Sequence, residues 1–343
     1  MEKLKLQLEK EKELYRELFI NAEKGFKDLV KKLKSNFSCI NCGVCCKVKY
    51  SKLSPDQIFG LANEENDKIS KEYIKLFAPY GVNKGFIYSK NNEISVEINN
   101  NLAKKENNNK LSLSYIESIL SKHTEPVYFY YCRNLDENNQ CIAKENSFLC
   151  DNFPDSVSII LPENCAYKSW QKLIMDTIKN EIEPEIELKI TEILNYRSKF
   201  SCNRTGTCCK LASSEFSYEE IKYKALNNDR FAKQFAEIFT PYQDIETARK
   251  VFPQYVDLLI SRCAENEKLN FYYCKHLKDG NICAMYESRP DICRDFPDNP
   301  LSIMPPSCGY YAWKEEVIVA AYTFHAMKQI YDFYFEKIKN VFY

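Results

Sequence analysis

Two short cysteine-rich stretches constrain this chain most strongly. Residues 37–47 read FSCINCGVCCK and residues 200–210 read FSCNRTGTCCK, so the same frame occurs twice with one cysteine changed. The whole chain has 16 cysteines among 343 residues. Cysteines at this density form either a disulfide scaffold or metal sites, and the redox compartment usually decides between the two.

The N-terminal sequence favours metal sites. Residues 1–19 lack the apolar run and the small-residue cleavage site of a secretory signal. The longest apolar stretch near the C-terminus, residues 317–327, is shorter than the roughly 18 residues that a bilayer span requires. We therefore expect a cytoplasmic protein with no membrane span, whose reduced thiols are available to bind metal.

The similarity between the two halves extends well beyond these stretches. The matched cysteines are Cys39 and Cys202, Cys45 and Cys208, Cys46 and Cys209, Cys132 and Cys274, Cys141 and Cys283, Cys150 and Cys293, and Cys165 and Cys308. A tryptophan follows five residues after the last cysteine of each half, at Trp170 and Trp313. This pattern predicts a tandem duplication, with one cysteine-cluster repeat at 1–175 and a second at 185–343.

The first repeat carries an insertion. The offset between matched cysteines falls from 163 residues at Cys39 and Cys202 to 142 at Cys132 and Cys274, a difference of 21. Residues 91–110, which are polar and rich in asparagine, account for it. We expect this segment to be a solvated surface insertion without chemistry.

The pattern of apolar residues predicts a mainly helical fold. Residues 4–35, 185–196 and 314–343 have apolar side chains at helical spacing. Ser54 with Gln57, and Ser217 with Glu220, have the spacing of helix-capping boxes. We expect Pro184 to interrupt the connection between the repeats.

Strands are expected to be few and short. β-branched and aromatic residues cluster at 127–131, at 157–161 and at their counterparts in the second half. The expected fold class is therefore mainly α with small strand pairs, a helix-dominated α+β architecture in which the strands hold the cysteines.

The eight cysteines of the first repeat divide naturally into two four-thiolate sites. They are Cys39, Cys42, Cys45, Cys46, Cys132, Cys141, Cys150 and Cys165. In an extended segment adjacent side chains point to opposite faces, so Cys45 and Cys46 are expected to reach different centres. The alternative is one site with the remaining cysteines simply buried.

The spacing of the thiolates leaves two metals open. Three cysteines at x2 spacing in CINCGVC resemble the runs that hold iron–sulfur clusters, whereas zinc sites more often use separated pairs. We favour an iron–sulfur cluster narrowly and keep zinc as the alternative. Arg294, which directly follows Cys293, is the candidate donor to a metal-bound thiolate.

The second repeat is incomplete. It retains Cys202, Cys208, Cys209, Cys274, Cys283, Cys293 and Cys308, but Thr205 stands where the first repeat has Cys42. A neutral hydroxyl is a poor ligand for zinc or iron. Three interpretations remain open: the site has decayed, Cys263 replaces the missing ligand, or a bound metal keeps one position open for a substrate.

Charge and composition limit the classes of binding partner that we expect. Lys plus Arg and Asp plus Glu number 48 each, which argues against broad electrostatic binding of nucleic acid. The aromatic C-terminal helix at 314–343 could serve as a contact surface for a protein partner. No substrate follows from the sequence.

The motifs CINCGVCC and CAMYESRPDICRDFP resemble the YkgJ-type CxxCxxCC cysteine-cluster family, whose members are described as zinc- or iron-chelating domains. The resemblance implies metal binding in both repeats. The family includes relatives of flagellin lysine-N-methylase, so it also permits an iron–sulfur-dependent protein-modifying enzyme. A third alternative is a zinc-stabilised interaction module. No glycine-rich nucleotide loop or catalytic motif is present, so neither catalytic nor organic-cofactor residues are assigned.

Overall fold

The computed structural model describes residues 2–40, 43–64, 67–79, 109–123, 125, 127–136, 138, 140–143, 147–262, 268–304 and 306–343. They form two compact units. Unit N consists of Asn21–Pro184 and Lys328–Tyr343, and unit C consists of Met1–Ile20 and Glu185–Met327. Each unit contains one of the two cysteine-rich stretches. The expected insertion at 91–110 lies outside the described residues except for its last two, which begin a helix.

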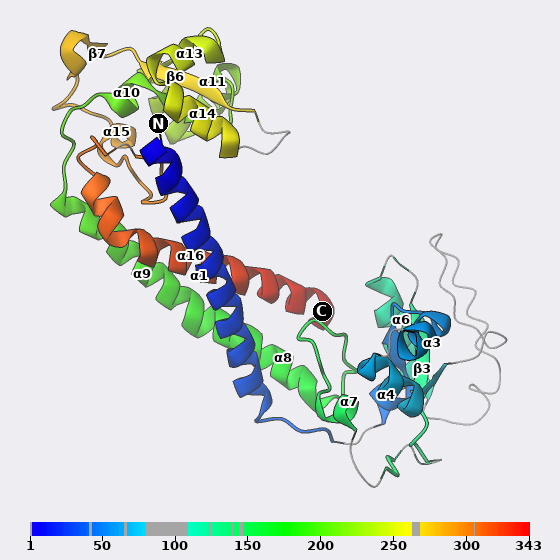
Figure 1. The fold of residues 1–343 in the computed structure, drawn as a ribbon. Helices are drawn as coiled ribbons and strands as arrows, with labels where there is room; N and C mark the ends of the chain where they lie inside the picture. The colour runs from blue at the N-terminus through cyan, green and yellow to red at the C-terminus, as the bar shows by residue number, and fades with distance from the viewer. Residues whose placement is uncertain are drawn as a thin grey trace. The chain divides into compact units, whose positions relative to one another are not determined.

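Unit N is built around a small antiparallel sheet. Its strand order is β1-β3-β2, and β3 is flanked by α3, α4 and α6 (Figure 1). The strands are β1 (Lys49–Ser51), β2 (Phe77–Pro79) and β3 (Tyr128–Cys132). The helices are α1 (Glu2–Lys34), which begins in unit C, α2 (Val44–Lys47), α3 (Pro55–Asn63), α4 (Lys68–Leu76), α6 (Asn109–Ser121), α7 (Phe148–Asp151) and α8 (Ala166–Thr177).

Unit C has a sheet of the same kind. Its order is β4-β6-β5, with a separate hairpin of β7 and β8, and β6 is flanked by α11, α13 and α14 (Figure 1). The strands are β4 (Ala212–Ser214), β5 (Phe239–Pro241), β6 (Asn270–Cys274), β7 (Leu277–Lys278) and β8 (Ile282–Cys283). The helices are α9 (Glu183–Tyr196), α10 (Thr207–Lys210), α11 (Tyr218–Leu226), α12 (Arg230–Ile238), α13 (Ile245–Val251), α14 (Pro253–Arg262), α15 (Asp291–Arg294) and α16 (Tyr311–Phe342), whose last residues belong to unit N.

The two sheets share one register. Cys132 at the end of β3 lies opposite Phe77, and Cys274 at the end of β6 lies opposite Phe239. In each unit a buried tyrosine of the central strand is contacted edge-on by an aromatic ring. Tyr73 of α4 contacts Tyr130 with ring centroids 5.1 Å apart, and Phe235 of α12 contacts Tyr272 with ring centroids 5.0 Å apart. The predicted strand at 127–131 and its counterpart are thus confirmed, as is the helix-dominated α+β fold class.

The helix starts follow the predicted capping chemistry. Ser54 accepts a hydrogen bond from the Gln57 backbone while the Gln57 side chain accepts one from the Ser54 backbone. Ser217 and Glu220 form the same box at the start of α11. Each box satisfies two backbone donors that would otherwise lack a helical partner.

A buried tryptophan ties a long helix to each unit. The Trp170 indole, which is 1% exposed, donates to the Val30 carbonyl of α1 at 3.3 Å. The Trp313 indole is fully buried and donates to the Ile193 carbonyl of α9 at 3.1 Å. The predicted helices at 4–35, 185–196 and 314–343 are confirmed with small changes at their ends.

Two expectations about the backbone are wrong. Helical geometry continues through Pro184, because a π-helical stretch, Ile178–Ile182, precedes it and the proline lies in the first turn of α9, where no intrahelical N–H bond is needed. Residues 157–161 form no strand. Their backbone is satisfied by side chains instead: Gln171 donates to the carbonyls of Val157 and Ile159 at 2.8 and 2.7 Å.

Among the described helices, none combines the length and hydropathy that crossing a bilayer demands.

Candidate metal centre

The adjacent cysteines of each unit lie in a short helical turn, not in the extended segment that the sequence led us to expect. Gly43 and Gly206 have φ of 73° and 71° and begin α2 and α10, respectively. Positive φ is readily available only to glycine, so these residues fix the turn. A hydrogen bond from the Cys45 thiol lowers the pKa of Cys46 to about 7, while burial acts to raise it. The adjacent thiols therefore lie within hydrogen-bonding reach of each other.

One set of thiols gathers around the central strand of unit C. Cys209 and Cys293 pack against the same hydrophobic cluster that contains Cys274. Burial, together with the nearby thiols of Cys209, Cys274 and Cys283, raises the pKa of Cys293 to about 12. We call Cys209, Cys274, Cys283 and Cys293 the strand group of unit C. Its members come from α10, β6, β8 and α15.

Unit N has a corresponding strand group, made of Cys46, Cys132, Cys141 and Cys150. Burial raises the pKa of Cys132, and the other three thiols add to that effect. Cys141 pairs with Leu135 through an isolated bridge, as Cys283 pairs with Leu277 between β7 and β8. Cys150 lies in α7, which Ser147 caps: the Ser147 hydroxyl accepts a hydrogen bond from the Cys150 backbone N–H at 3.4 Å.

A second set of thiols in unit C consists of Cys202, Cys208 and Cys308, which we call its helix group because Cys308 leads into α16. Cys308 packs against the hydrophobic cluster of Trp313, separate from the cluster of the strand group. The pKa of Cys208 is raised by its hydrogen bond to Cys209, by burial, and by the thiols of Cys209, Cys202 and Cys308. The helix and strand groups therefore meet at the adjacent pair Cys208 and Cys209.

Contacts between neighbouring residues bring the segments of Cys202 and Cys308 together. The Asn203 side-chain amide donates to the Ser307 carbonyl at 2.6 Å. Gly309 approaches the same segment so closely that a Cβ added to it would lie 2.1 Å from the Ser201 carbonyl oxygen. Only glycine is compatible with this approach. Neighbours of both cysteines are thus fixed against each other.

The helix group of unit N consists of Cys39, Cys45 and Cys165 among the described residues. Burial raises the pKa of Tyr167, and the thiols of Cys39, Cys165 and Cys45 contribute to the rise, so all three lie near this ring. The two other predicted ligands, Cys42 and Cys263, lie outside the described residues. Both stay predictions that rest on the sequence.

Each unit places a cation beside its thiols. In unit N burial lowers the pKa of Lys49, while Asp155 and the thiols of Cys45, Cys46 and Cys150 act to raise it. In unit C the hydrogen bond with Cys208 lowers the pKa of Cys209 to about 7, and the positive charge of Arg289 contributes to that decrease. Arg289 also opposes the rise in the pKa of Cys293. A cation in this position offsets thiolate charge.

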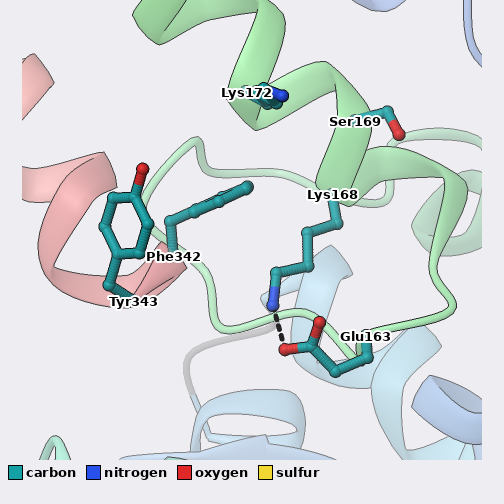
Figure 2. A pocket seen from close by; sticks show the side chains of 6 residues that line it. All are labelled: Glu163, Lys168, Ser169, Lys172, Phe342 and Tyr343. Atoms are coloured by element: carbon teal, nitrogen blue, oxygen red, sulfur yellow. Dashed lines mark hydrogen bonds and ion pairs between the residues drawn. The ribbon is translucent and has the colours of Figure 1, made fainter.

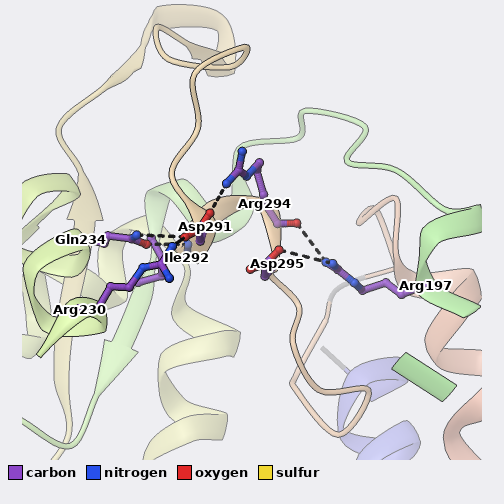
Figure 3. Close-up of polar contacts among 7 residues, drawn as sticks. All are labelled: Arg197, Arg230, Gln234, Asp291, Ile292, Arg294 and Asp295. Atoms are coloured by element: carbon purple, nitrogen blue, oxygen red, sulfur yellow. Dashed lines mark hydrogen bonds and ion pairs between the residues drawn. The ribbon is translucent and has the colours of Figure 1, made fainter. Parts of the chain in front are cut away.

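The sequence pointed to Arg294 as a donor to a metal-bound thiolate, and the structure gives this side chain a carboxylate partner. Its guanidinium pairs with Asp291, and its carbonyl accepts a hydrogen bond from Arg197 at 3.1 Å (Figure 3). Asp291 also pairs with Arg230 of α12, and the side-chain Oε1 of Gln234 accepts a hydrogen bond from the Ile292 backbone N–H at 3.0 Å. Arg294 therefore belongs to the network that fixes α15, the turn that carries Cys293.

A surface hollow of about 410 Å³ in unit N lies apart from the thiol groups (Figure 2). Its lining side chains are Glu163, Lys168, Ser169, Lys172, Phe342 and Tyr343. Lys168 pairs with Glu163 and lies 5.1 Å from the centre of the Phe342 ring. No thiol lines this hollow, so it has no part in the proposed metal sites.

The donor chemistry of the groups suits zinc or iron, because clustered cysteine thiolates are the preferred ligands of zinc and of iron–sulfur clusters. No disulfide joins the cysteines within the described part of the chain. In that same part, no three or more His, Cys, Asp or Glu side chains are already arranged to hold a metal ion. The fold thus brings the thiols near one another, and their side chains must move before they can coordinate a metal ion.

Comparison with known proteins supports a metal-binding assignment for part of the chain. Residues 201–316 match the CxxCxxCC family, described as a "putative zinc- or iron-chelating domain". The match contains every described thiol of unit C, but it covers less than half of the chain. Neither the curated proteins nor the solved structures include a match to this chain.

Proposed function

We propose that this chain binds zinc or iron through cysteine thiolates at two sites in each unit, one at the strand group and one at the helix group. One observation carries the proposal: the thiols of each unit divide into two groups that meet at an adjacent cysteine pair. The same division is found in both units.

The repeated local structure supports a tandem duplication. Both units have a three-stranded antiparallel sheet with the middle strand last in sequence, a Ser-capped helix followed by an Asp-capped helix, and a glycine before the cysteine turn. Asp67 caps α4 and Asp229 caps α12 through the same backbone position. One duplication explains all of these shared features, whereas independent origin would require each of them to arise twice.

The choice of metal differs for the two groups. The helix group of unit N, completed by Cys42, contains the CINCGVC spacing that favours an iron–sulfur cluster. The strand groups draw their four thiols from separate elements, which a tetrahedral zinc ion accepts equally well. We favour iron–sulfur for unit N and keep zinc as the alternative for every group.

Metal binding is expected to stabilise both units. Because the thiols are not yet in coordinating positions, an ion that draws them together links α2 or α10 to the central strand and to the later cysteine turns. Binding free energy then adds to folding free energy.

The test is to purify the full chain anaerobically and measure metal content, acid-labile sulfide and visible absorption. Iron with sulfide and a brown colour would establish cluster binding, and colourless protein with about two to four zinc ions per chain would establish zinc sites. Protein that contains no metal and takes up neither ion under reducing conditions would overturn the proposal.

A further inference from the structure

Two arginines of unit C stack on one tyrosine ring, an arrangement that we call the arginine sandwich. The guanidinium carbons of Arg204 and Arg289 lie 3.7 and 3.9 Å from the centre of the Tyr286 ring. Two guanidinium groups cannot share one ring face at these distances without overlap, so they cover opposite faces. The two cations are therefore about 7.6 Å apart across the ring (3.7 plus 3.9).

Local contacts hold both arginines in place. Arg204 has a φ of 59°, in the left-handed region, and its backbone N–H donates to the Cys202 Sγ at 3.4 Å. The Arg289 Nε donates to the Tyr286 carbonyl at 2.9 Å. Because the two guanidinium groups are positioned before a ligand arrives, a ligand pays less conformational entropy to engage them.

Neither guanidinium of the sandwich has a carboxylate partner among the described residues. Other arginines of unit C do have one: Arg197 pairs with Asp295, Arg230 and Arg294 with Asp291, and Arg249 with Glu246 and Asp257. Two like charges held close together repel each other, and a ligand with two negative charges relieves that repulsion. Arg204 is exposed and Arg289 is half-buried, so such a ligand can reach both from solvent.

Stacking leaves hydrogen-bond donors of both guanidinium groups available. The flat face of each group covers the tyrosine ring, while its N–H groups point outward in the guanidinium plane, where they match the two oxygens of a carboxylate. In the described part of the chain, Arg289 uses its Nε for the Tyr286 carbonyl, which leaves its terminal amino groups for a ligand. Each arginine can therefore bind a carboxylate of its own.

The arginine sandwich belongs to the second repeat alone. Asn41 and Lys144 occupy the sequence positions of Arg204 and Tyr286, and the first repeat is one residue shorter where Arg289 occurs. Both units contain the thiol groups, so a role shared by those groups does not account for the sandwich. We therefore looked for a ligand that only unit C would bind.

The separation of the two cations matches an extended acidic peptide. Residues i and i+2 of a strand project to the same side and are about 6.6 Å apart, so two carboxylates at these positions can each meet one guanidinium. A nucleic acid fits less well. Both faces of Tyr286 are covered, so its ring cannot stack on a base, and the chain as a whole has no excess of basic residues.

We propose that the arginine sandwich is a docking site for an extended acidic segment of a partner protein, in which two carboxylates two residues apart each pair with one guanidinium. No single group then has to contact both faces of the ring. Charge complementarity of this kind confers specificity and accelerates association. The proposal goes beyond metal binding and does not depend on it.

The test titrates short peptides into the full chain, purified anaerobically, and follows binding by microscale thermophoresis. The peptide Ser-Glu-Ser-Glu-Ser, with blocked ends, is expected to bind saturably with a Kd below about 1 mM. Its glutamine counterpart should not bind. The isomer Ser-Glu-Glu-Ser-Ser has the same charge, but its adjacent glutamates point to opposite sides of a strand, so it should bind about tenfold more weakly.

Substitutions in the protein locate the site. Arg204→Gln and Arg289→Gln should each weaken binding of the alternating peptide about tenfold, because each removes one charge-assisted pair. Tyr286→Phe retains the ring and should bind normally. The matched control is Arg249→Gln, which removes an arginine that is already paired with carboxylates and should leave the affinity unchanged.

Three results would overturn the proposal. The first is no saturable binding of the alternating peptide to the folded chain. The second is equal affinity for the two peptide isomers, which would indicate unspecific attraction between charges. The third is tighter binding of a single-stranded oligonucleotide of the same charge, which would identify a nucleic acid as the ligand. The peptide comparisons use the unaltered protein, so they remain decisive even if an arginine variant fails to fold.

Discussion

Gly309 and Ser201 approach each other so closely that a Cβ on Gly309 would lie 2.1 Å from the Ser201 carbonyl oxygen. Each residue is directly bonded to a cysteine of the helix group, Gly309 to Cys308 and Ser201 to Cys202. This close approach, and not sequence proximity, brings together two thiols that are 106 positions apart (308 − 202). It therefore provides a precise way to disturb one metal site.

Gly309→Ala is expected to separate Cys202 from Cys308. The added methyl group must displace backbone, because the nearest atoms are the Ser201 carbonyl and the Asn203 nitrogen. Overpacking of this kind costs about 1–3 kcal/mol. The variant should lose the metal of that helix group while retaining the others, as measured by metal analysis and thermal unfolding.

The control is Gly25→Ala in α1, where an added Cβ meets nothing within 4 Å. Alanine is the better helix former, so this variant should gain about 0.5–1 kcal/mol with unchanged metal content. Equal behaviour of the two variants would contradict the account of Gly309.

Tyr73→Phe is expected to stabilise unit N. The Tyr73 hydroxyl is buried and finds no hydrogen-bond partner among the described residues. Phe235 occupies the corresponding position of unit C and contacts Tyr272 edge-on at 5.0 Å, as Tyr73 contacts Tyr130 at 5.1 Å. Removing the hydroxyl should raise the free energy of unfolding by about 1 kcal/mol, measured by chemical denaturation.

The reverse substitution tests the same reasoning. Phe235→Tyr should lower the stability of unit C by about 1–3 kcal/mol, because it introduces a buried hydroxyl without a partner. A stabilising Phe235→Tyr would show that this position tolerates a polar group, and the argument from Tyr73 would then be wrong.

Asp291→Asn is expected to loosen the turn that carries Cys293. Asp291 pairs with Arg230 of α12 and with Arg294, and these pairs, together with side-chain hydrogen bonds, lower its pKa (Figure 3). Neutralising it should weaken metal binding at the strand group of unit C by several-fold, measured by competition with a chelator. Glu246→Gln, which removes one exposed partner of Arg249, should leave metal affinity unchanged.

Lys314 and Glu11 form a buried ion pair that fixes α16 to α1 within unit C. Their side chains are 3% and 10% exposed, the Lys314 Nζ lies 3.2 Å from the carboxylate, and the Tyr322 hydroxyl donates to Glu11 at 3.0 Å. Lys314→Met should cost about 3–5 kcal/mol, because it leaves a carboxylate buried without its cation. The loss should appear as a lower midpoint of thermal unfolding.

The double variant Glu11→Gln/Lys314→Gln should lose much less stability than Lys314→Met. Unit N already has glutamine at the corresponding position, where Gln171 donates to two carbonyls. A double variant as unstable as the single one would mean that the charges themselves are required.

Local sequence chemistry predicted much of the fold. The capping boxes at Ser54 and Ser217, the three long helices and the central strands depend on residues close in sequence, and all were found. The strand expected at 157–161 does not form. The side chains of Gln171, Tyr115 and Tyr50 form hydrogen bonds with its backbone groups in place of a neighbouring strand. These partners are distant in sequence from residues 157–161, so no local sequence pattern predicts them.

The candidate site was less accessible to sequence reasoning. The cysteines could be identified individually, but their grouping depends on which elements the fold brings together, such as β6 with α15. Arg294 was chosen over Arg289 because it is adjacent to Cys293, yet Asp291 lies one helical turn away and engages it. The single signal for Arg289 was its absence from the first repeat.

The most direct test of the central claim is the metal content of Cys283→Ser, Cys202→Ser and the double variant, all as full-length protein purified anaerobically. Cys283 belongs to the strand group of unit C and Cys202 to its helix group. The account predicts that each single variant loses the metal of one site and that the double variant loses both. Loss of both sites in either single variant, or no loss in any, would contradict the division into two groups.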